Sequence, residues 1–289
     1  MGMWMATLDY LTERRLIQRG FRILDIGSQN LYNATPETIR GFVEQLGHIE
    51  NEAQFIKEAE RISYFSAPRP GERTAFIAEL LDLVDIEYLG YDVCPSPGTE
   101  IFDLNIQLQP EERRNYFDIV LNFGTTEHLI NQLNAFEVIH DAMKVGAVAF
   151  HQLPSVGWID HGYFSYNALF IDDLVKANDY DVVDKFFTPA GTSKFGALGV
   201  DVRDASKPLI PHSASAPAKV LNFNLNYIIR KTVDAPFNVG LEIATTHAPL
   251  SSEAEAVYGS NRRLAAGEVV RQRARESNAT VSITKPDVS

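Results

Sequence analysis

The chain has 289 residues, of which 45% are hydrophobic and 22% are charged, as in an ordinary globular protein rather than a disordered or fibrous one. Its formal net charge is −12 at pH 7, and because an acidic surface repels phosphate groups we expect no nucleic-acid partner. A single cysteine, Cys94, excludes an intramolecular disulfide and a metal site made of several cysteines.

Hydropathy along the chain bears on its location. The opening residues contain too short an apolar stretch for a signal peptide. No run approaches the ~18 apolar residues of a membrane span. Together with the single cysteine, these features predict a cytoplasmic protein that does not enter a membrane.

The first part of the chain predicts a helix, a strand and then a block of helices. Residues 8–19 carry apolar side chains at helical spacing, and residues 21–26 form an apolar run that stops at Gly27. From residue 36 to about residue 84 the pattern is helical again, with a Pro/Gly break at 67–71. We expect two or three helices there.

Strands and helices alternate in the middle of the chain. Strand-like apolar segments recur at residues 86–91, 117–123 and 145–152, and a helical segment at 135–144 separates the last two. A further helix is predicted at 170–178. This rhythm is typical of right-handed βαβ units around a parallel sheet.

The last third of the chain changes character. A strand predicted at 180–187 is followed by a segment rich in Gly, Ser and Pro, at 188–217, and then by one long strand at 220–231. A long loop that returns to a last strand indicates an antiparallel hairpin near the sheet edge. Residues 251–289 predict one helix and an unstructured end. We therefore divide the chain into one domain, 1–250, and a tail, 251–289.

Polar residues stand where the predicted strands end, and doubly wound sheets bind ligands at that edge. Gly27 lets the backbone approach a ligand. Asp92 is suited to accept hydrogen bonds from ribose hydroxyls, and Asp103 from the exocyclic amine of adenine. The structural alternatives are a plain strand-to-loop turn at Gly27, a solvated loop aspartate at Asp92, and a turn or helix cap at Asp103.

Taken in order, these motifs resemble the class I S-adenosylmethionine-dependent methyltransferases. LDIGSQN stands at the glycine motif of that family, and FDIVLNFGTTEHL at its fourth strand, with the EHL ending common in the type 11 subgroup. The resemblance implies an α/β fold: a doubly wound, mostly parallel, seven-stranded Rossmann-like sheet whose last strand is antiparallel. It also implies S-adenosylmethionine as cofactor. The residues it assigns to that cofactor are Asp25, Gly27, Ser28, Gln29, Asp92, Val93, Asp103, Leu104, Asn122 and Phe123.

The sequence departs from the family pattern in two places. The glycine motif lacks its second and third glycines, and Gln29 stands in one of these positions. The distance from Gly27 to Asp92 is also far longer than usual, so we interpret residues 36–84 as a helical insertion. Our hypothesis is that this insertion covers the substrate and excludes water.

Histidines after the predicted strand 145–152 are the candidates for catalysis. Methyl transfer to a hydroxyl requires removal of a proton, and histidine titrates in the useful range. We therefore predict catalytic roles for His161 and His151, with a hydrogen-bonded structural histidine as the alternative at His151. For Glu127, the alternative to a contact with the substrate is a favourable interaction with the helix dipole. For Tyr163 and Tyr166, the alternative is packing in the core of the loop. The residues we assign to the substrate are Glu127, His128, Tyr163 and Tyr166.

The histidines are scattered along the chain without the spacing of a zinc or iron motif, so we predict no metal. The activity implied is direct, in-line transfer of a methyl group to an oxygen or nitrogen of a small molecule or saccharide. Two alternatives stay open: a catalytically silent, methyltransferase-like binding or scaffold protein, and another adenosine-cofactor transferase. Hydride transfer is disfavoured because GxGxxG is absent. The acidic surface and the predicted tail helix are compatible with a homodimer without requiring one.

Overall fold

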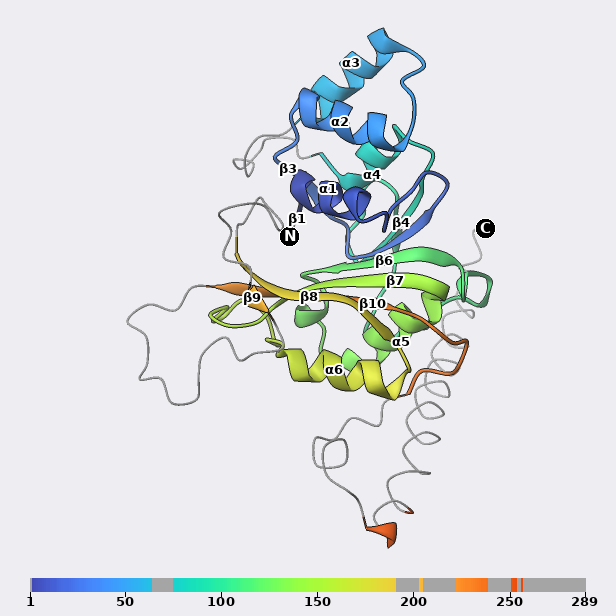
Figure 1. The fold of residues 1–289 in the computed structure, drawn as a ribbon, viewed down its shortest axis with the longest axis vertical. Helices are drawn as coiled ribbons and strands as arrows, with labels where there is room; N and C mark the ends of the chain where they lie inside the picture. The colour runs from blue at the N-terminus through green and yellow to red at the C-terminus, as the bar shows by residue number, and fades with distance from the viewer. Residues whose placement is uncertain are drawn as a thin grey trace, which may run out of the picture.

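An eight-stranded β-sheet runs through the protein (Figure 1), seen in a computed structural model that describes residues 2–63, 75–190, 203–204, 222–238, 251–253 and 256. The order of the strands across the sheet is β5-β4-β2-β6-β7-β10-β8-β9. The strands are β2 (Arg22–Ile26), β4 (Glu87–Asp92), β5 (Thr99–Ile101), β6 (Phe117–Phe123), β7 (Met143–Pro154), β8 (Asp181–Pro189), β9 (Arg203–Asp204) and β10 (Phe223–Arg230).

Neighbouring strands from β5 to β7 are all parallel, and β10 is antiparallel to both β7 and β8. The predicted doubly wound, mostly parallel, seven-stranded sheet with a last antiparallel strand is therefore confirmed. The short β9 adds an eighth strand, antiparallel to β8, that the sequence does not predict. A separate two-stranded sheet pairs β1 (Gly2–Trp4) with β3 (Asn30–Tyr32), also without a sequence signal.

Helices cover both faces of the sheet (Figure 1), α1 to α4 on one side and α5 and α6 on the other. Burial on both faces explains why β6 is buried at every position and reads as a continuous apolar run. Alternate side chains of β2 join opposite cores, with Ile23 on the α1 side and Leu24 on the α5 side. The helices are α1 (Met5–Glu13), α2 (Pro36–Leu46), α3 (Glu52–Ile62), α4 (Ile77–Leu81), α5 (Gln132–Ala142) and α6 (Ala168–Ala177).

The segment 36–84 contains α2, α3 and α4, in agreement with its helical pattern. Thr35 caps α2 by accepting a hydrogen bond from the Thr38 amide at 3.2 Å, and Pro36 occupies the first turn. The apolar side of α2 packs in the same core as α1 through Ile39 and Phe42, both fully buried. These contacts make α2 part of the body of the domain, and its role as a lid stays a prediction.

Some sequence predictions differ from the structure or lie outside it. The helix predicted at 8–19 ends at Glu13, because Arg15 adopts a left-handed conformation with φ 55°. Most of 188–217 and of the tail 251–289 lies outside the described residues, so the tail helix is not tested. None of the described helices has both the length and the apolar character needed to cross a bilayer.

Candidate functional site

The parallel strands end at one edge of the sheet, and the chain order changes direction there between β2 and β6. This is the place where open α/β sheets bind ligands. The turn after β2 and the end of β4 are tied together: the Gly27 amide donates to the Tyr91 carbonyl at 2.8 Å, and the Ser28 amide to Oδ2 of Asp92 at 2.9 Å. The Cys94 amide donates to the other carboxylate oxygen of Asp92 at 2.9 Å. Gly27, Ser28 and Asp92 thus meet, as predicted from their strand ends.

Gly27 is required by the geometry of this turn. Its φ is +86°, and a Cβ at this position would overlap Oγ1 of Thr125 and lie 3.1 Å from its Cβ and Cγ2. Two strand-end loops, after β2 and after β6, therefore touch at Gly27. A side chain here would push them apart.

Asp25 lies inside the protein rather than at the open edge. Its side chain has no exposed surface, and its Oδ2 accepts a hydrogen bond from the Tyr88 hydroxyl at 2.9 Å. Burial raises the pKa of Asp25 well above its ordinary value. In this geometry Asp25 does not make the direct contact with a ligand that the sequence predicts. Its hydrogen bond with Tyr88 instead fixes β2 against β4.

Gln29 fills the position where the glycine motif lacks a glycine. It is 2% exposed, and its Nε2 donates to the carbonyls of Gly27 at 3.2 Å and of Phe123 at 3.1 Å. The side chain therefore links the turn after β2 to the end of β6. Phe123 is itself buried, at 2% exposure, so its carbonyl rather than its ring contributes to the edge.

The segment predicted to receive adenine has a structural role of its own. Oδ1 of Asp103 accepts a hydrogen bond from the Asn105 amide at 2.9 Å, which is the turn alternative for this residue. Leu104 is buried in the core on the α5 side. Val93, by contrast, is exposed beside Asp92.

His151 and Asn122 form a buried pair at the ends of β7 and β6. Asn122 Nδ2 lies 3.1 Å from Nδ1 of His151 and donates to Oγ1 of Thr126 at 3.1 Å. Burial lowers the pKa of His151 to about 4, so the ring is neutral near pH 7. With 1% of its surface exposed, His151 cannot reach a substrate in this arrangement. The structural alternative, rather than the predicted catalytic role, describes it.

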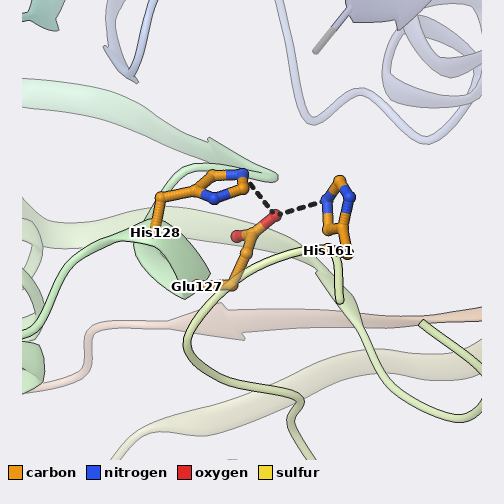
Figure 2. Close-up of side chains that lie close together, drawn as sticks. All are labelled: Glu127, His128 and His161. Carbon is orange, nitrogen blue, oxygen red and sulfur yellow. Dashed lines mark ion pairs between the residues drawn. The ribbon is translucent and has the colours of Figure 1, made fainter. Parts of the chain in front are cut away.

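Glu127, His128 and His161 come together at the same edge (Figure 2). Oε1 of Glu127 lies 3.6 Å from Nε2 of His128 and 3.5 Å from Nε2 of His161. The three candidate ligand atoms all lie within 4.8 Å of one another. Burial raises the pKa of Glu127 to about 7, and burial also lowers the pKa values of both histidines.

The loop after β7 is fastened to Glu127. The amides of Tyr163 and Phe164 donate to the Glu127 carbonyl at 2.8 and 3.2 Å. Gly162 permits this approach, since a Cβ there would lie 2.9 Å from that carbonyl oxygen. The motifs in the sequence do not single out Gly162. The sequence feature that could have pointed to it is a glycine directly after the candidate histidine His161.

The two tyrosines assigned to the substrate have different environments. Tyr163 is 73% exposed, and a contact with a substrate stays a prediction for it. Tyr166 is 6% exposed and donates to Oε1 of Gln132 at 2.5 Å. Tyr166 therefore belongs to the loop core.

A hollow of about 490 Å³ lies away from these residues, beside the α2–α3 turn and the chain that enters β4.

Matches to known proteins come from solved structures alone. No protein-family model matches the sequence, and no curated protein matches it significantly. Among solved structures, the chain is similar to the 1,6-didemethyltoxoflavin-N1-methyltransferase of Burkholderia thailandensis, crystallised with bound 1,6-didemethyltoxoflavin and S-adenosylhomocysteine. The identity is 13%, the match covers 79% of this chain and 78% of that chain, and the TM-score is 0.40.

Two further similar structures are S-adenosylmethionine-dependent methyltransferases from Archaeoglobus fulgidus and Aquifex aeolicus. The first is 11% identical over 78% of this chain and 93% of that chain, with a TM-score of 0.38. The second is 9% identical over 78% of this chain and 90% of that chain, with a TM-score of 0.36. At such identities and scores, the fold assignment rests on the strand order and directions. From β5 to β8, these are the order and directions of the Rossmann-like methyltransferase fold, with β10 as the reversed strand between β7 and β8.

Proposed function

We propose that the chain is an S-adenosylmethionine-dependent methyltransferase whose acceptor is an oxygen or nitrogen atom of a small molecule or saccharide. The observation that carries this proposal is the contact between the turn after β2 and the end of β4. There the Ser28 amide meets the Asp92 carboxylate at 2.9 Å, next to the left-handed Gly27. This brings a glycine turn and an acidic strand end together at the point where the sheet changes direction.

The residues at this contact suit the adenosine part of the cofactor. Asp92 accepts one amide on each oxygen, and because an ionised carboxylate has about four acceptor sites, it retains capacity for two ribose hydroxyls. It is half-buried, so a ligand can approach it. The cofactor supplies an electrophilic methyl group when bound. We assign the ribose to Asp92 and the adenine side to Asp103 and the backbone of Leu104.

The remaining work of the chain is to align the acceptor. Methyl transfer depends mainly on orientation, which a fixed sheet edge can provide. Of the two histidines predicted to be catalytic, His161 is the one that reaches this edge, with 26% of its side chain exposed. We therefore assign contact with the acceptor to His161 and not to the buried His151.

Isothermal titration of the purified chain with S-adenosylmethionine, S-adenosylhomocysteine and, as a control, NAD tests the proposal. We expect saturable binding of the first two and none of NAD. Asp92→Asn should weaken binding by about 10-fold, the cost of about 1.5 kcal/mol for losing hydrogen bonds to a charged group. Asp181→Asn, at an exposed position at the start of β8, should bind as the wild type does. A folded wild type that binds neither adenosyl compound would overturn the proposal.

One observation favours a second candidate, a methyltransferase-like protein that binds a partner without transferring a methyl group. The side chain of Gln29 donates to the carbonyls of Gly27 and Phe123, so it uses backbone acceptors at the edge that could otherwise bind a donor of the ligand. Replacement by glycine removes this bridge. If the wild type does not bind the cofactor and Gln29→Gly does, the second candidate is supported.

A further inference from the structure

We propose that Glu127, His128 and His161 form a binding site for one divalent first-row transition-metal ion, such as Zn²⁺. This site goes beyond the proposed methyl transfer and does not depend on it. It also replaces the expectation, drawn from the spacing of the histidines, that the protein has no metal site. Figure 2 shows the two imidazole rings directed at the same oxygen of Glu127 from opposite sides.

The distances fit coordination and do not fit hydrogen bonding. The two nitrogen–oxygen distances, 3.6 and 3.5 Å, are beyond the range of an effective hydrogen bond. Ligand atoms at about 2.1 Å from a tetrahedral ion are about 3.4 Å from one another. The two nitrogen–oxygen separations match this spacing, and the two histidine ligand atoms lie within 4.8 Å of each other.

The unpartnered atoms of the cluster are the second, independent observation. Glu127 has no exposed surface, and both of its carboxylate oxygens lack a hydrogen-bond partner among the described residues. Nε2 of His161 is likewise buried without a partner there. Buried polar groups are normally hydrogen-bonded, paired or bound to metal. A cation between the three side chains would satisfy Oε1 of Glu127 and Nε2 of His161 at once.

The donor set selects the class of ion. Two imidazoles and one carboxylate are typical ligands of Zn²⁺, and also of Fe²⁺ in sites that keep open positions. Mg²⁺ and Ca²⁺ prefer oxygen ligands. Because the protein supplies three ligands and His128 is 46% exposed, the ion would keep at least one position open toward the edge.

The surroundings hold the ligands in place. The chain around His161 is fastened to the Glu127 carbonyl through the amides of Tyr163 and Phe164. The ring of Trp158 lies 4.5 Å from that of His161, centroid to centroid. Support of this kind, outside the ligands themselves, fixes the orientation of metal-binding imidazoles.

The test uses the untagged, full-length chain, freed of metal by chelation. It is titrated with Co²⁺, whose visible absorption reports on coordination, and then with Zn²⁺. We expect saturation at one equivalent, displacement of Co²⁺ by Zn²⁺ and a higher Tm with Zn²⁺. His161→Ala should lose more than the roughly 10–100-fold in affinity that follows loss of a supporting residue. His48→Ala, at an exposed position in the α2–α3 turn, should bind as the wild type does.

Glu127→Gln is the second variant, because it keeps the size of the side chain and removes its charge. We expect weaker Co²⁺ binding in a protein whose far-ultraviolet circular dichroism is unchanged. Three results would overturn the proposal: a folded wild type that binds neither Co²⁺ nor Zn²⁺, equal affinity in wild type and His161→Ala, or Mg²⁺ binding as tight as Zn²⁺ binding.

Discussion

Replacing Gly27 by alanine tests the contact on which the proposed cofactor site depends, and the chain contains a matched control for it. Gly27 and Gly146 have nearly the same φ, +86° and +87°. A Cβ on Gly146 meets nothing within 4 Å, whereas a Cβ on Gly27 overlaps Thr125. The two substitutions therefore share the strain of a left-handed residue and differ in the collision.

The expected magnitudes follow from these two terms. A left-handed backbone costs a residue with a Cβ about 1–2 kcal/mol, so Gly146→Ala should lower the free energy of unfolding by that amount. Forcing a methyl group into a packed site adds about 1–3 kcal/mol. Gly27→Ala should therefore lower the free energy of unfolding by about 1–3 kcal/mol more than Gly146→Ala does. Thr125→Ala removes Oγ1 and Cγ2, and leaves only the Cβ at 3.1 Å. In that background, the excess cost of Gly27→Ala should largely disappear.

Urea denaturation of the wild type, the three single variants and the double variant measures these costs. The reasoning is refuted if Gly27→Ala costs no more than Gly146→Ala, or if Thr125→Ala leaves the cost of Gly27→Ala unchanged. Cofactor titration of the same proteins adds a functional readout, in which Gly146→Ala should match the wild type and Gly27→Ala should bind more weakly.

Two further predictions concern buried charge. Because burial lowers the pKa of His151 from 6.5 to about 4, its contribution to stability is complete above pH 6.5 and falls by about 3 kcal/mol as the pH drops to 4. His151→Gln should therefore lose less stability than the wild type between pH 7 and pH 4 in urea titrations; parallel losses would contradict this. Lys231 is 1% exposed and donates to Asn115, His140 and Met143, so Lys231→Met should cost about 1–3 kcal/mol through unpaired acceptors. The exposed Lys176→Met is its control in the same assay, and equal costs would show that the buried bonds contribute nothing.

The fold could be predicted because its signals are local and long. The apolar runs of β2 and β6 and the middle of β7 are buried on both faces, and the helices between the strands repeat the βαβ rhythm. The pairing of β1 with β3 could not be predicted in this way. Each has only three residues, too few for a periodic pattern, and their partnership depends on the return of the chain after Gly27.

The position of the site in the fold could be predicted from the sequence, but the burial of its side chains could not. Parallel strands place their carboxyl ends together, and this brought Gly27 to Asp92 and Asn122 to His151. Whether a residue at a strand end faces solvent depends on the loops packed over it. Here those loops leave Asp25 with no exposed surface and His151 with 1%. His128 and His161 are far apart in the sequence, so their meeting required the path of the loop after β7.

The metal cluster and the glycine turn share one short segment, and this links the two proposals. Thr125 touches Gly27, Thr126 accepts a hydrogen bond from Asn122, and Glu127 and His128 follow directly. An ion that fixes Glu127 would order the segment that supports the turn after β2.

We therefore expect Zn²⁺ to tighten S-adenosylmethionine binding by about 5-fold or more, the lower end of typical coupling between sites. Linkage requires the cofactor to tighten Zn²⁺ binding by the same factor. His161→Ala should abolish both effects while retaining cofactor binding. Unequal factors measured in the two directions would mean that Zn²⁺ also binds elsewhere, and unchanged cofactor affinity in the presence of bound Zn²⁺ would show that the two sites are independent.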